Sequence, residues 1–267
     1  MGYWGPITSN YDWCEENYVW TQYIAEFFNT LSSIPVALAG VSFLRLTREH
    51  GYGFKFSLAS IALIVIGVGS FAFHGTLLRS AQMLDEIPML WGSLSFLWIA
   101  ISLNYPPGAA EVFRWGLALG AYGAGSTFIY ATSGFEIFVI LYIATVVCCV
   151  VLTVIRTWTS PIRSQIWPFS AASIGFYAGG FLVLWLPEQL FCGNRVETSH
   201  DSVLLRLHVP LHAYFHITSA LGPFCFLTYA AFSRLHQLGK RPTLRYLSKM
   251  EMGMLPLPVA CVDGKAA

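Results

Sequence analysis

The sequence has 267 residues, a length that fits one domain or two small ones. It is 55% hydrophobic and 11% charged, with a mean hydropathy of +0.58, whereas soluble domains carry about 25% charged residues. This composition excludes an ordinary cytosolic enzyme, a disordered chain and a nucleic-acid-binding protein. The formal net charge of +1 implies no electrostatic partner. The chain therefore reads as a membrane protein with several spans.

Charged residues divide the chain into seven uncharged windows, each 18 to 27 residues long. The windows cover 27–44, 56–78, 87–110, 115–135, 137–155, 164–187 and 207–233. Because a helix needs about 20 residues to cross the hydrocarbon core of a bilayer, we expect an all-α bundle of seven transmembrane helices. Only Glu136 separates the fourth window from the fifth, and the Ala-Thr-Ser-Gly run at 131–134 predicts a tight turn just before it.

The distribution of Lys and Arg orients these helices. Seven spans place the two termini on opposite sides of the membrane. If the N-terminus is not cytosolic, twelve of the fifteen Lys and Arg residues lie on the cytosolic side, as the positive-inside rule requires. We therefore predict a luminal or extracellular acidic segment at 1–25, a transmembrane domain at 26–237 and a basic cytosolic tail at 238–267. The tail is polar and contains proline, so we expect it to be loose.

Five polar residues fall at one predicted depth near the outer side of the spans. Ser70 and His74 lie near the outer end of the second window, Asp85 begins the third helix, and His212 and His216 lie in the opening turns of the seventh. Ionisable groups inside a span are costly and usually functional. Residues spaced i, i+4 share a helix face, so the two histidines of the seventh helix can bind one metal ion together.

A third histidine from another helix completes a three-nitrogen ligand set, here His74 with His212 and His216. Zinc held by three protein ligands keeps its fourth position for water and lowers the pKa of that water to about 7. We predict that Asp85 orients this water and takes its proton. Ser70, one turn from His74, is predicted to hydrogen-bond to an oxyanion or to that carboxylate.

Each of these residues also has a simpler interpretation. A single His-x-x-x-His pair often arises by chance, and a serine in a span commonly bonds to its own helix backbone. Asp85 is equally compatible with a helix N-cap. The common depth, deduced from Lys and Arg alone, favours a metal site over these readings. His208, one turn further out than His212, is interpreted as interfacial.

These residues and the N-terminal sequence resemble the alkaline ceramidase family, and within it the alkaline ceramidase 3 and phytoceramidase type. The similarity extends from Gly2 to about Arg245. It is carried by the segments 2–9 (GYWGPITS), 12–18 (DWCEENY), 25–30 (AEFFNT), 69–74 (GSFAFH), 85–89 (DEIPM) and 212–216 (HAYFH). A wider superfamily of seven-helix membrane hydrolases, which includes adiponectin-receptor-like proteins, shares only the Ser, His, Asp and His-x-x-x-His pattern. The acidic N-terminal motif is therefore the more specific signature.

The resemblance implies hydrolysis of the amide bond of ceramide, dihydroceramide or phytoceramide to a sphingoid base and a fatty acid. It implies that the three histidines bind zinc, that Asp85 activates the water and that Ser70 assists at the oxyanion. Tyr142 matches a pocket tyrosine of the family, with packing inside the bundle as its simpler interpretation. The implied location is the membrane of the endoplasmic reticulum or Golgi, with no nucleic-acid or protein partner.

The acidic N-terminal segment is, from its residues alone, more simply a solvated or helix-capping stretch than a metal site. Carboxylate, amide and carbonyl oxygens are nevertheless the ligands that calcium takes. The resemblance to the family implies a structural calcium ion bound by Asp12, Trp13 (through its carbonyl), Glu15, Asn17 and Glu26. Glu26 at the membrane edge would also be costly if it were unpaired.

The resemblance further implies a disulfide between Cys14 and Cys192, which both lie on the predicted luminal side, where an oxidising environment permits the bond. The chain departs from the family just before the second cysteine. The family typically has Trp-Asn-x-Asp there, and this chain has Trp-Leu-Pro-Glu at 185–188. Glu188 offers a substitute for the acid, whereas Pro187 is expected to alter the helix end.

Two other functions stay open at this stage. One is a seven-helix lipid receptor of the same superfamily, in which zinc is structural. The other is a lipid-ester hydrolase that uses the same metal site. The N-terminal motif favours the ceramidase branch over the receptor.

Overall fold

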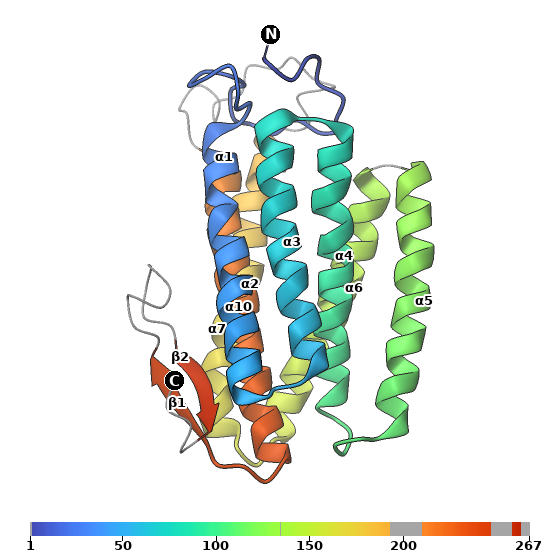
Figure 1. Cartoon of the computed structure of the whole chain (residues 1–267), viewed down its shortest axis with the longest axis vertical. Helices are drawn as coiled ribbons and strands as arrows, with labels where there is room; N and C mark the ends of the chain where they lie inside the picture. The colour runs from blue at the N-terminus through green and yellow to red at the C-terminus, as the bar shows by residue number, and fades with distance from the viewer. Residues whose placement is uncertain (1, 134, 193–209, 247–257, 263–267) are drawn as a thin grey trace.

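The computed structural model describes residues 2–133, 135–192, 210–246 and 258–262. Within them the chain forms a bundle of long helices, with a small two-stranded sheet at one end and the N-terminal segment across the other (Figure 1). The elements in chain order are α1 (Phe27–Ser32), α2 (Ile34–His50), α3 (Phe54–Thr76), α4 (Arg79–Ser102), α5 (Ala110–Ser133), α6 (Phe135–Thr159), α7 (Arg163–Gly179), the π-helical η1 (Gly180–Trp185), α8 (Leu186–Phe191), α10 (Leu211–Gln237), β1 (Pro242–Tyr246) and β2 (Pro258–Val262).

The helices α1 and α2 form one long segment with a break at Ser33. Pro35, in the first turn of α2, has no backbone N–H to continue the hydrogen-bond ladder of α1. The Ser33 hydroxyl bonds back to the Asn29 carbonyl at 2.9 Å, which stabilises the break. α2 ends at Gly51, whose φ of 68° is a left-handed conformation that glycine adopts without strain.

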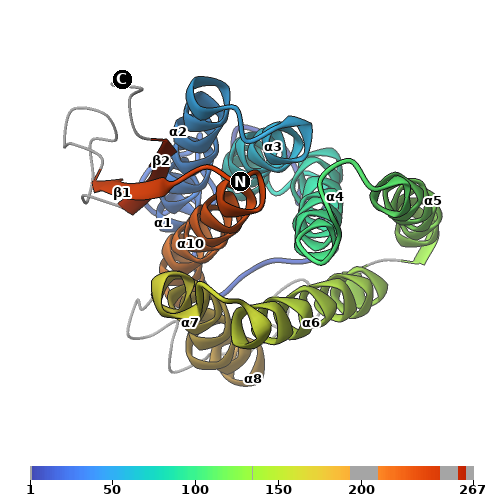
Figure 2. The same cartoon turned by 90° about the horizontal axis from the view of Figure 1, so that it is seen from below.

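The helix α10 lies in the interior of the bundle, between α2 on one side and α7 on the other (Figure 2). Phe224, Leu227, Tyr229 and Ala230 of this helix are buried in the main hydrophobic core. Because α10 is packed on several faces, its position is determined by the core along most of its length. The core therefore fixes the height in the bundle at which side chains of the first turns of α10 lie.

Close helix contacts depend on small residues. A Cβ atom at Gly67 of α3 would lie 2.4 Å from the backbone nitrogen of Ala37 in α2. A Cβ atom at Gly40 of α2 would lie 2.7 Å from the Ser60 carbonyl oxygen in α3. Glycine thus lets the two backbones approach closely, as in membrane helix bundles generally.

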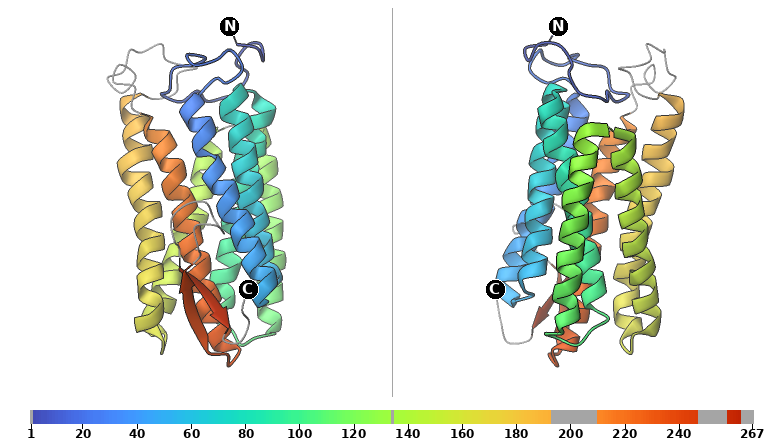
Figure 3. Two further views of the ribbon diagram at one scale, coloured as in Figure 1. Left: turned by 60° about the vertical axis from the view of Figure 1, so that its left-hand side comes forward. Right: turned by 90° about the vertical axis from the view of Figure 1, so that its right-hand side faces the viewer.

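Six helical segments of the described chain are long and apolar enough to cross a membrane, which makes this a helical membrane protein. Each of the seven predicted windows falls mostly on helix in the described chain, with non-helical residues at 33, 77–78, 103–109 and 210. The helix that is not among the six is α5, whose many small residues, with Glu111 and Arg114, lower its hydropathy. It stands at the outside of the bundle, beside α4 and α6 (Figures 2 and 3).

The prediction of a loose tail is wrong for its described part. β1 and β2 pair antiparallel, with Leu244 opposite Ala260. Val259, Ala260 and Cys261 are buried in the main core, and the Tyr52 hydroxyl donates a hydrogen bond to the Ala260 carbonyl. The apolar run at 258–262 was missed because the tail as a whole is polar, whereas a strand needs only about five residues.

Candidate active site

Three buried histidines lie together at the end of the bundle that the N-terminal segment covers. His74 comes from the last turns of α3, and His212 and His216 come from the first two turns of α10. One ligand nitrogen from each lies within 4.8 Å of the other two, and the ring centroids are 4.5 to 5.0 Å apart. The predicted juxtaposition is confirmed. Within the described ranges, no other His, Cys, Asp or Glu set of three is as close.

Two of these imidazole rings are each held by a hydrogen bond at Nδ1. Nδ1 of His74 bonds to the Glu26 carboxylate, and Nδ1 of His216 lies 2.8 Å from the Ser32 hydroxyl. Nε2 of His74 is buried and has no hydrogen-bond partner among the described residues. Metal-binding histidines almost always bond through their other ring nitrogen to a carboxylate, a carbonyl or water, and His74 has this arrangement. The donor set therefore fits a metal ion such as zinc.

Asp85 and Ser70 face the same cavity as the histidines of α10. Asp85 is buried, and within the described chain its Oδ1 has no hydrogen-bond partner. The Ser70 hydroxyl lies 2.8 Å from that of Ser33, at the break between α1 and α2. An unpaired carboxylate oxygen and a positioned hydroxyl beside three imidazoles are suited to proton transfer and to binding of an oxyanion.

The placement of Asp85 corrects one prediction. α4 begins at Arg79, with Leu78 as its N-cap, so Asp85 neither begins the helix nor caps it. The charge-bounded window placed the helix start too late because it excluded the charged residues Arg79, Asp85 and Glu86 that precede residue 87. The Arg79 guanidinium lies over the Tyr130 ring and donates to the Tyr130 hydroxyl at 2.9 Å, which accommodates the charge at the first residue of α4.

Gly69 brings α3 and α4 together beside Asp85. A Cβ atom at Gly69 would lie 2.2 Å from the Leu84 carbonyl oxygen and 2.9 Å from the Asp85 backbone nitrogen. Both atoms belong to the backbone, so no side-chain rotation would relieve the clash. The glycine thus sets the distance between Ser70, its chain neighbour, and Asp85.

Sequence reasoning missed Glu86. This carboxylate is buried and lines the cavity, where it accepts hydrogen bonds from the Tyr130 hydroxyl and, at 2.9 Å, from the Gln82 amide. Arg79 donates to the same tyrosine. The sequence analysis gave Glu86 no role of its own, although two adjacent carboxylates before an apolar run could have signalled a buried acidic pair.

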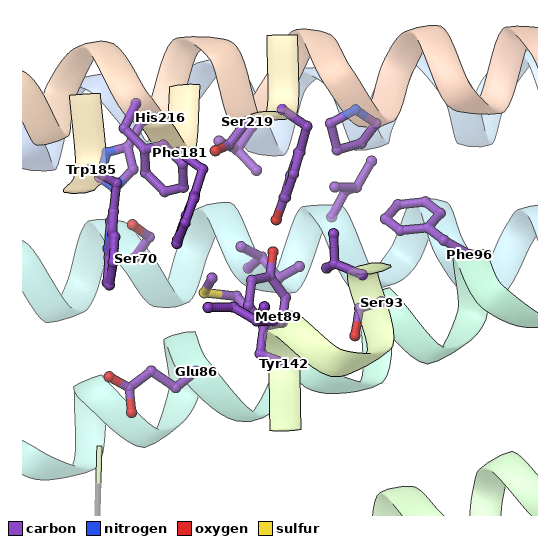
Figure 4. Close-up of a pocket in the computed structure, with 18 of the residues that line it drawn as sticks. Ser70, Glu86, Met89, Ser93, Phe96, Tyr142, Phe181, Trp185, His216 and Ser219 are labelled. Atoms are coloured by element: carbon purple, nitrogen blue, oxygen red, sulfur yellow. The ribbon is translucent and has the colours of Figure 1, made fainter. Parts of the chain in front are cut away.

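An elongated cavity runs from this site between α3, α4, α6, α7 and α10. Its volume is about 1410 Å³, including the space at its opening. Ser70 and His216 lie toward one end, Tyr142 near the middle and Phe96 toward the other end (Figure 4). The Tyr142 ring also stacks on Phe138 at a centroid distance of 5.5 Å, so this residue both lines the cavity and packs within the bundle.

The predicted calcium ligands gather around the loop before α1. The Asn17 amide nitrogen lies 3.0 Å from each carboxylate oxygen of Asp12. The backbone N–H of Trp13 donates to Glu26 at 2.9 Å, and the Asp12 side chain bonds to Glu26 as well. Glu15 accepts the N–H groups of Phe28 and Asn29 in α1, at 2.7 and 2.9 Å. Glu15 thus acts as a helix cap, which the sequence had left as the simpler reading.

The electrostatics of this cluster fit a bound cation. Burial raises the pKa of Glu15 and, together with the nearby Glu15 carboxylate, raises the pKa of Glu26 to about 8. Oδ1 of Asn17 is buried, with no partner in the described part of the chain, because the amide turns its nitrogen toward Asp12. A cation at this place would satisfy the carboxylates and favour the opposite amide orientation.

The predicted disulfide between Cys14 and Cys192 is present, with the two Cα atoms 5.7 Å apart. It ties the N-terminal segment to the end of α8. Pro187 does not end the helix there, because it occupies the first turn of α8, where its missing N–H is tolerated. Its effect appears one turn earlier, where η1 is π-helical.

The fold and the site together define a helical membrane protein with a buried histidine centre at one end of an apolar cavity. A family model described as Ceramidase matches residues 5–259, and this chain belongs to the ceramidase family.

The chain is similar to several curated proteins over most of its length. It is 32% identical over 253 residues to "Alkaline ceramidase 3" of Mus musculus, covering 92% of this chain and 91% of the relative. It is 28% identical over 260 residues to "Alkaline ceramidase" of Arabidopsis thaliana, with coverages of 95% and 93%. It is 27% identical over 266 residues to "Alkaline ceramidase" of Drosophila melanogaster, with coverages of 92% and 85%.

Proposed function

We propose that this protein hydrolyses the amide bond of ceramides in a reaction that depends on zinc bound by His74, His212 and His216. The observation that carries the proposal is the position of three buried histidines within 4.8 Å of one another beside an apolar cavity. Three protein ligands with a free fourth position are typical of catalytic zinc. The names of the relatives and membership of the ceramidase family support ceramide as the substrate.

The shape of the cavity supports a substrate with long hydrocarbon chains and one hydrolysable polar group. Phe96 lines the end of the cavity far from His216 (Figure 4). Leu63 and Phe226 also line the cavity, and each lies about three helical turns from the nearest histidine of its own helix. The amide of ceramide would lie at the histidine end, with the hydrocarbon among the helices. Burial of hydrocarbon against such walls is favourable by about 25 cal/mol for each Å² removed from water.

The bound zinc would supply a Lewis acid that polarises the amide carbonyl and lowers the pKa of water. Asp85 takes the proton from the attacking water and delivers it to the leaving nitrogen, so that a sphingoid base and a fatty acid are released. The Ser70 hydroxyl, fixed by Ser33, donates to the oxyanion. Tyr142 contacts the substrate further along the cavity.

We also propose that the N-terminal cluster binds a structural calcium ion. Its ligands are the side chains of Asp12, Glu15, Asn17 and Glu26 and the carbonyl of Trp13. The cation offsets the repulsion among buried carboxylates. It thereby stabilises Glu26, which is hydrogen-bonded to His74.

The membrane arrangement of the proposal follows the charge pattern of the chain. α5 completes a set of seven spans, although its hydropathy is lower than that of the six apolar segments. The N-terminus and the histidine centre face the lumen, and the β1–β2 hairpin lies in the cytosol. The host membrane is that of the endoplasmic reticulum or Golgi.

The test is release of sphingoid base, measured by mass spectrometry on purified protein with an unsaturated long-chain ceramide and with phytoceramide. We expect release to vanish with a zinc chelator, to return with added zinc, and to be absent in His74→Ala. His236→Ala is the matched control, because this exposed histidine lies in the last turn of α10, far from the site. Activity retained in His74→Ala would exclude the zinc mechanism.

Two further results would redirect the assignment. Hydrolysis of lipid esters faster than ceramide would indicate a lipid-ester hydrolase at the same site. Zinc-loaded protein that binds sphingoid base and turns over no ceramide would indicate a receptor.

A further inference from the structure

Glu188 is a buried carboxylate that the proposed reaction does not use. It lies in α8, at the place where the sequence departs from the family pattern, and is 2% exposed. A buried carboxylate is costly unless hydrogen bonds compensate for its lost hydration. Its contacts therefore indicate what this side chain stabilises.

The Glu188 carboxylate connects two segments that are far apart in the sequence. The backbone N–H of Cys14 donates to its Oε1 at 3.0 Å. The backbone N–H of His212 approaches the same carboxylate, whose Oε2 has no hydrogen-bond partner among the described residues. One side chain of α8 therefore bonds to the N-terminal segment and lies against the beginning of α10.

The approach to His212 places a carboxylate from another helix at the N-terminus of α10. His212 is the second residue of α10, so its N–H is one of the donors that have no partner inside the helix. The N-cap residue, Pro210, provides no side-chain cap. A carboxylate at this place is favoured by the partial positive charge of the helix N-terminus.

The same arrangement fixes the His212 ring. Trp13, the residue before Cys14, stacks on the His212 imidazole with centroids 3.5 Å apart and an interplanar angle of 23°. Because Glu188 bonds to the backbone of Cys14 and lies against the first turn of α10, it keeps the Trp13 indole stacked on the His212 imidazole.

We infer that Glu188 is a positioning residue that fixes the first turn of α10, and with it the metal-facing orientation of His212. This inference rests on the proposed zinc site. It assigns a role to Glu188, which stands at a position where the family sequence differs. It also explains why an ionisable side chain is tolerated in the interior of the bundle at this position.

The neighbouring Gln189 provides a matched control. Its side-chain oxygen accepts a hydrogen bond from the Tyr11 hydroxyl. Gln189→Ala therefore removes a contact between α8 and the N-terminal segment while leaving the Glu188 carboxylate in place against α10. Any general effect of loosening α8 would appear in both variants.

The experiment compares wild type, Glu188→Ala, Glu188→Gln and Gln189→Ala as purified full-length protein. Zinc affinity is measured by competition with a fluorescent chelator, and hydrogen exchange is measured for the amides at 211–215. We expect zinc binding about 10-fold weaker in Glu188→Ala, as for losses of residues that orient metal ligands, and several-fold weaker in Glu188→Gln. Exchange should be faster in both and unchanged in Gln189→Ala. Excess zinc should restore kcat.

The outcomes separate this inference from the proposed function. Unchanged zinc affinity and unchanged exchange in either Glu188 variant that folds would overturn the inference, as would an equal loss in Gln189→Ala. If wild type binds no zinc, the proposed function fails. Faster exchange confined to the Glu188 variants would then still support its role at the start of α10, and normal exchange would refute it.

Discussion

The Glu26 carboxylate accepts a hydrogen bond from Nδ1 of His74, and this bond joins the N-terminal acidic cluster to the histidine centre. Both side chains are buried completely or almost so. Glu26 also accepts hydrogen bonds from the Trp13 backbone and, at 3.1 Å, from the Asn29 amide. The orientation of one imidazole thus depends on a loop that lies outside the helices.

Replacement of Glu26 by Gln should weaken zinc binding by about 10- to 100-fold. The Gln amide would donate to Nδ1 of His74, so the ring proton would move to Nε2, the nitrogen that faces the other histidines. Metal content and chelator competition measure the effect. Glu16→Gln is the control because Glu16 is exposed in the same segment, and equal losses in both variants would contradict this account.

Replacement of Asp85 by Asn should lower turnover by about 10²- to 10⁴-fold, the usual contribution of a general base. The amide keeps the size of the side chain but cannot take a proton from water. Zinc content should stay normal, because Asp85 is not in the ligand set. Glu86→Gln tests the adjacent carboxylate. A larger loss of turnover there than in Asp85→Asn would move the base to Glu86.

Replacement of Gly69 by Ala should destabilise the protein by about 1–3 kcal/mol, as overpacking typically does, and should lower activity. The added methyl group would push the backbone of α4 away at Leu84 and Asp85. Thermal unfolding in detergent and turnover measure both effects. Gly120→Ala in α5 meets no atom within 4 Å, so it should leave both unchanged or slightly raise stability. Normal activity in Gly69→Ala would show that this spacing is not required.

Calcium should raise the unfolding temperature of the wild type, because a ligand that binds only the folded state stabilises it. Asp12→Asn should abolish most of that increase, since it removes the charge of one carboxylate proposed to bind the ion. The measurement is the unfolding temperature as a function of calcium concentration. An identical calcium response in Asp12→Asn would remove the calcium site, whereas Glu16→Gln should respond like wild type.

The histidine centre could be predicted because it follows from two features of the sequence, the spacing of residues within one helix and the order of the helices. The i, i+4 spacing of His212 and His216 places them on one helix face, and the charge pattern puts His74 at the same depth. The Cys14–Cys192 pairing followed from the family resemblance, together with the predicted membrane orientation, which places both cysteines on the luminal side. These inferences need only the order of the helices and the side on which each one ends.

The remaining features depend on contacts that no sequence period encodes. The pairing of Glu26 with His74 joins a loop to a helix. The start of α4 at Arg79 depends on Tyr130, a residue of α5. The packing of β2 depends on an apolar stretch too short to stand out in a polar tail. Each of these requires knowledge of which segments meet in space.

The position of α10 after the other described long helices has a consequence for the order of assembly. This helix supplies two of the three histidines, and it is synthesised after the other long helices of the described chain. During synthesis, His74 and Glu26 can meet, but no chelating pair exists until α10 has entered the bundle. Loading of the proposed zinc ion therefore has to follow the synthesis of α10. A chain that stalls before α10 would hold its earlier helices without ever acquiring a reactive centre.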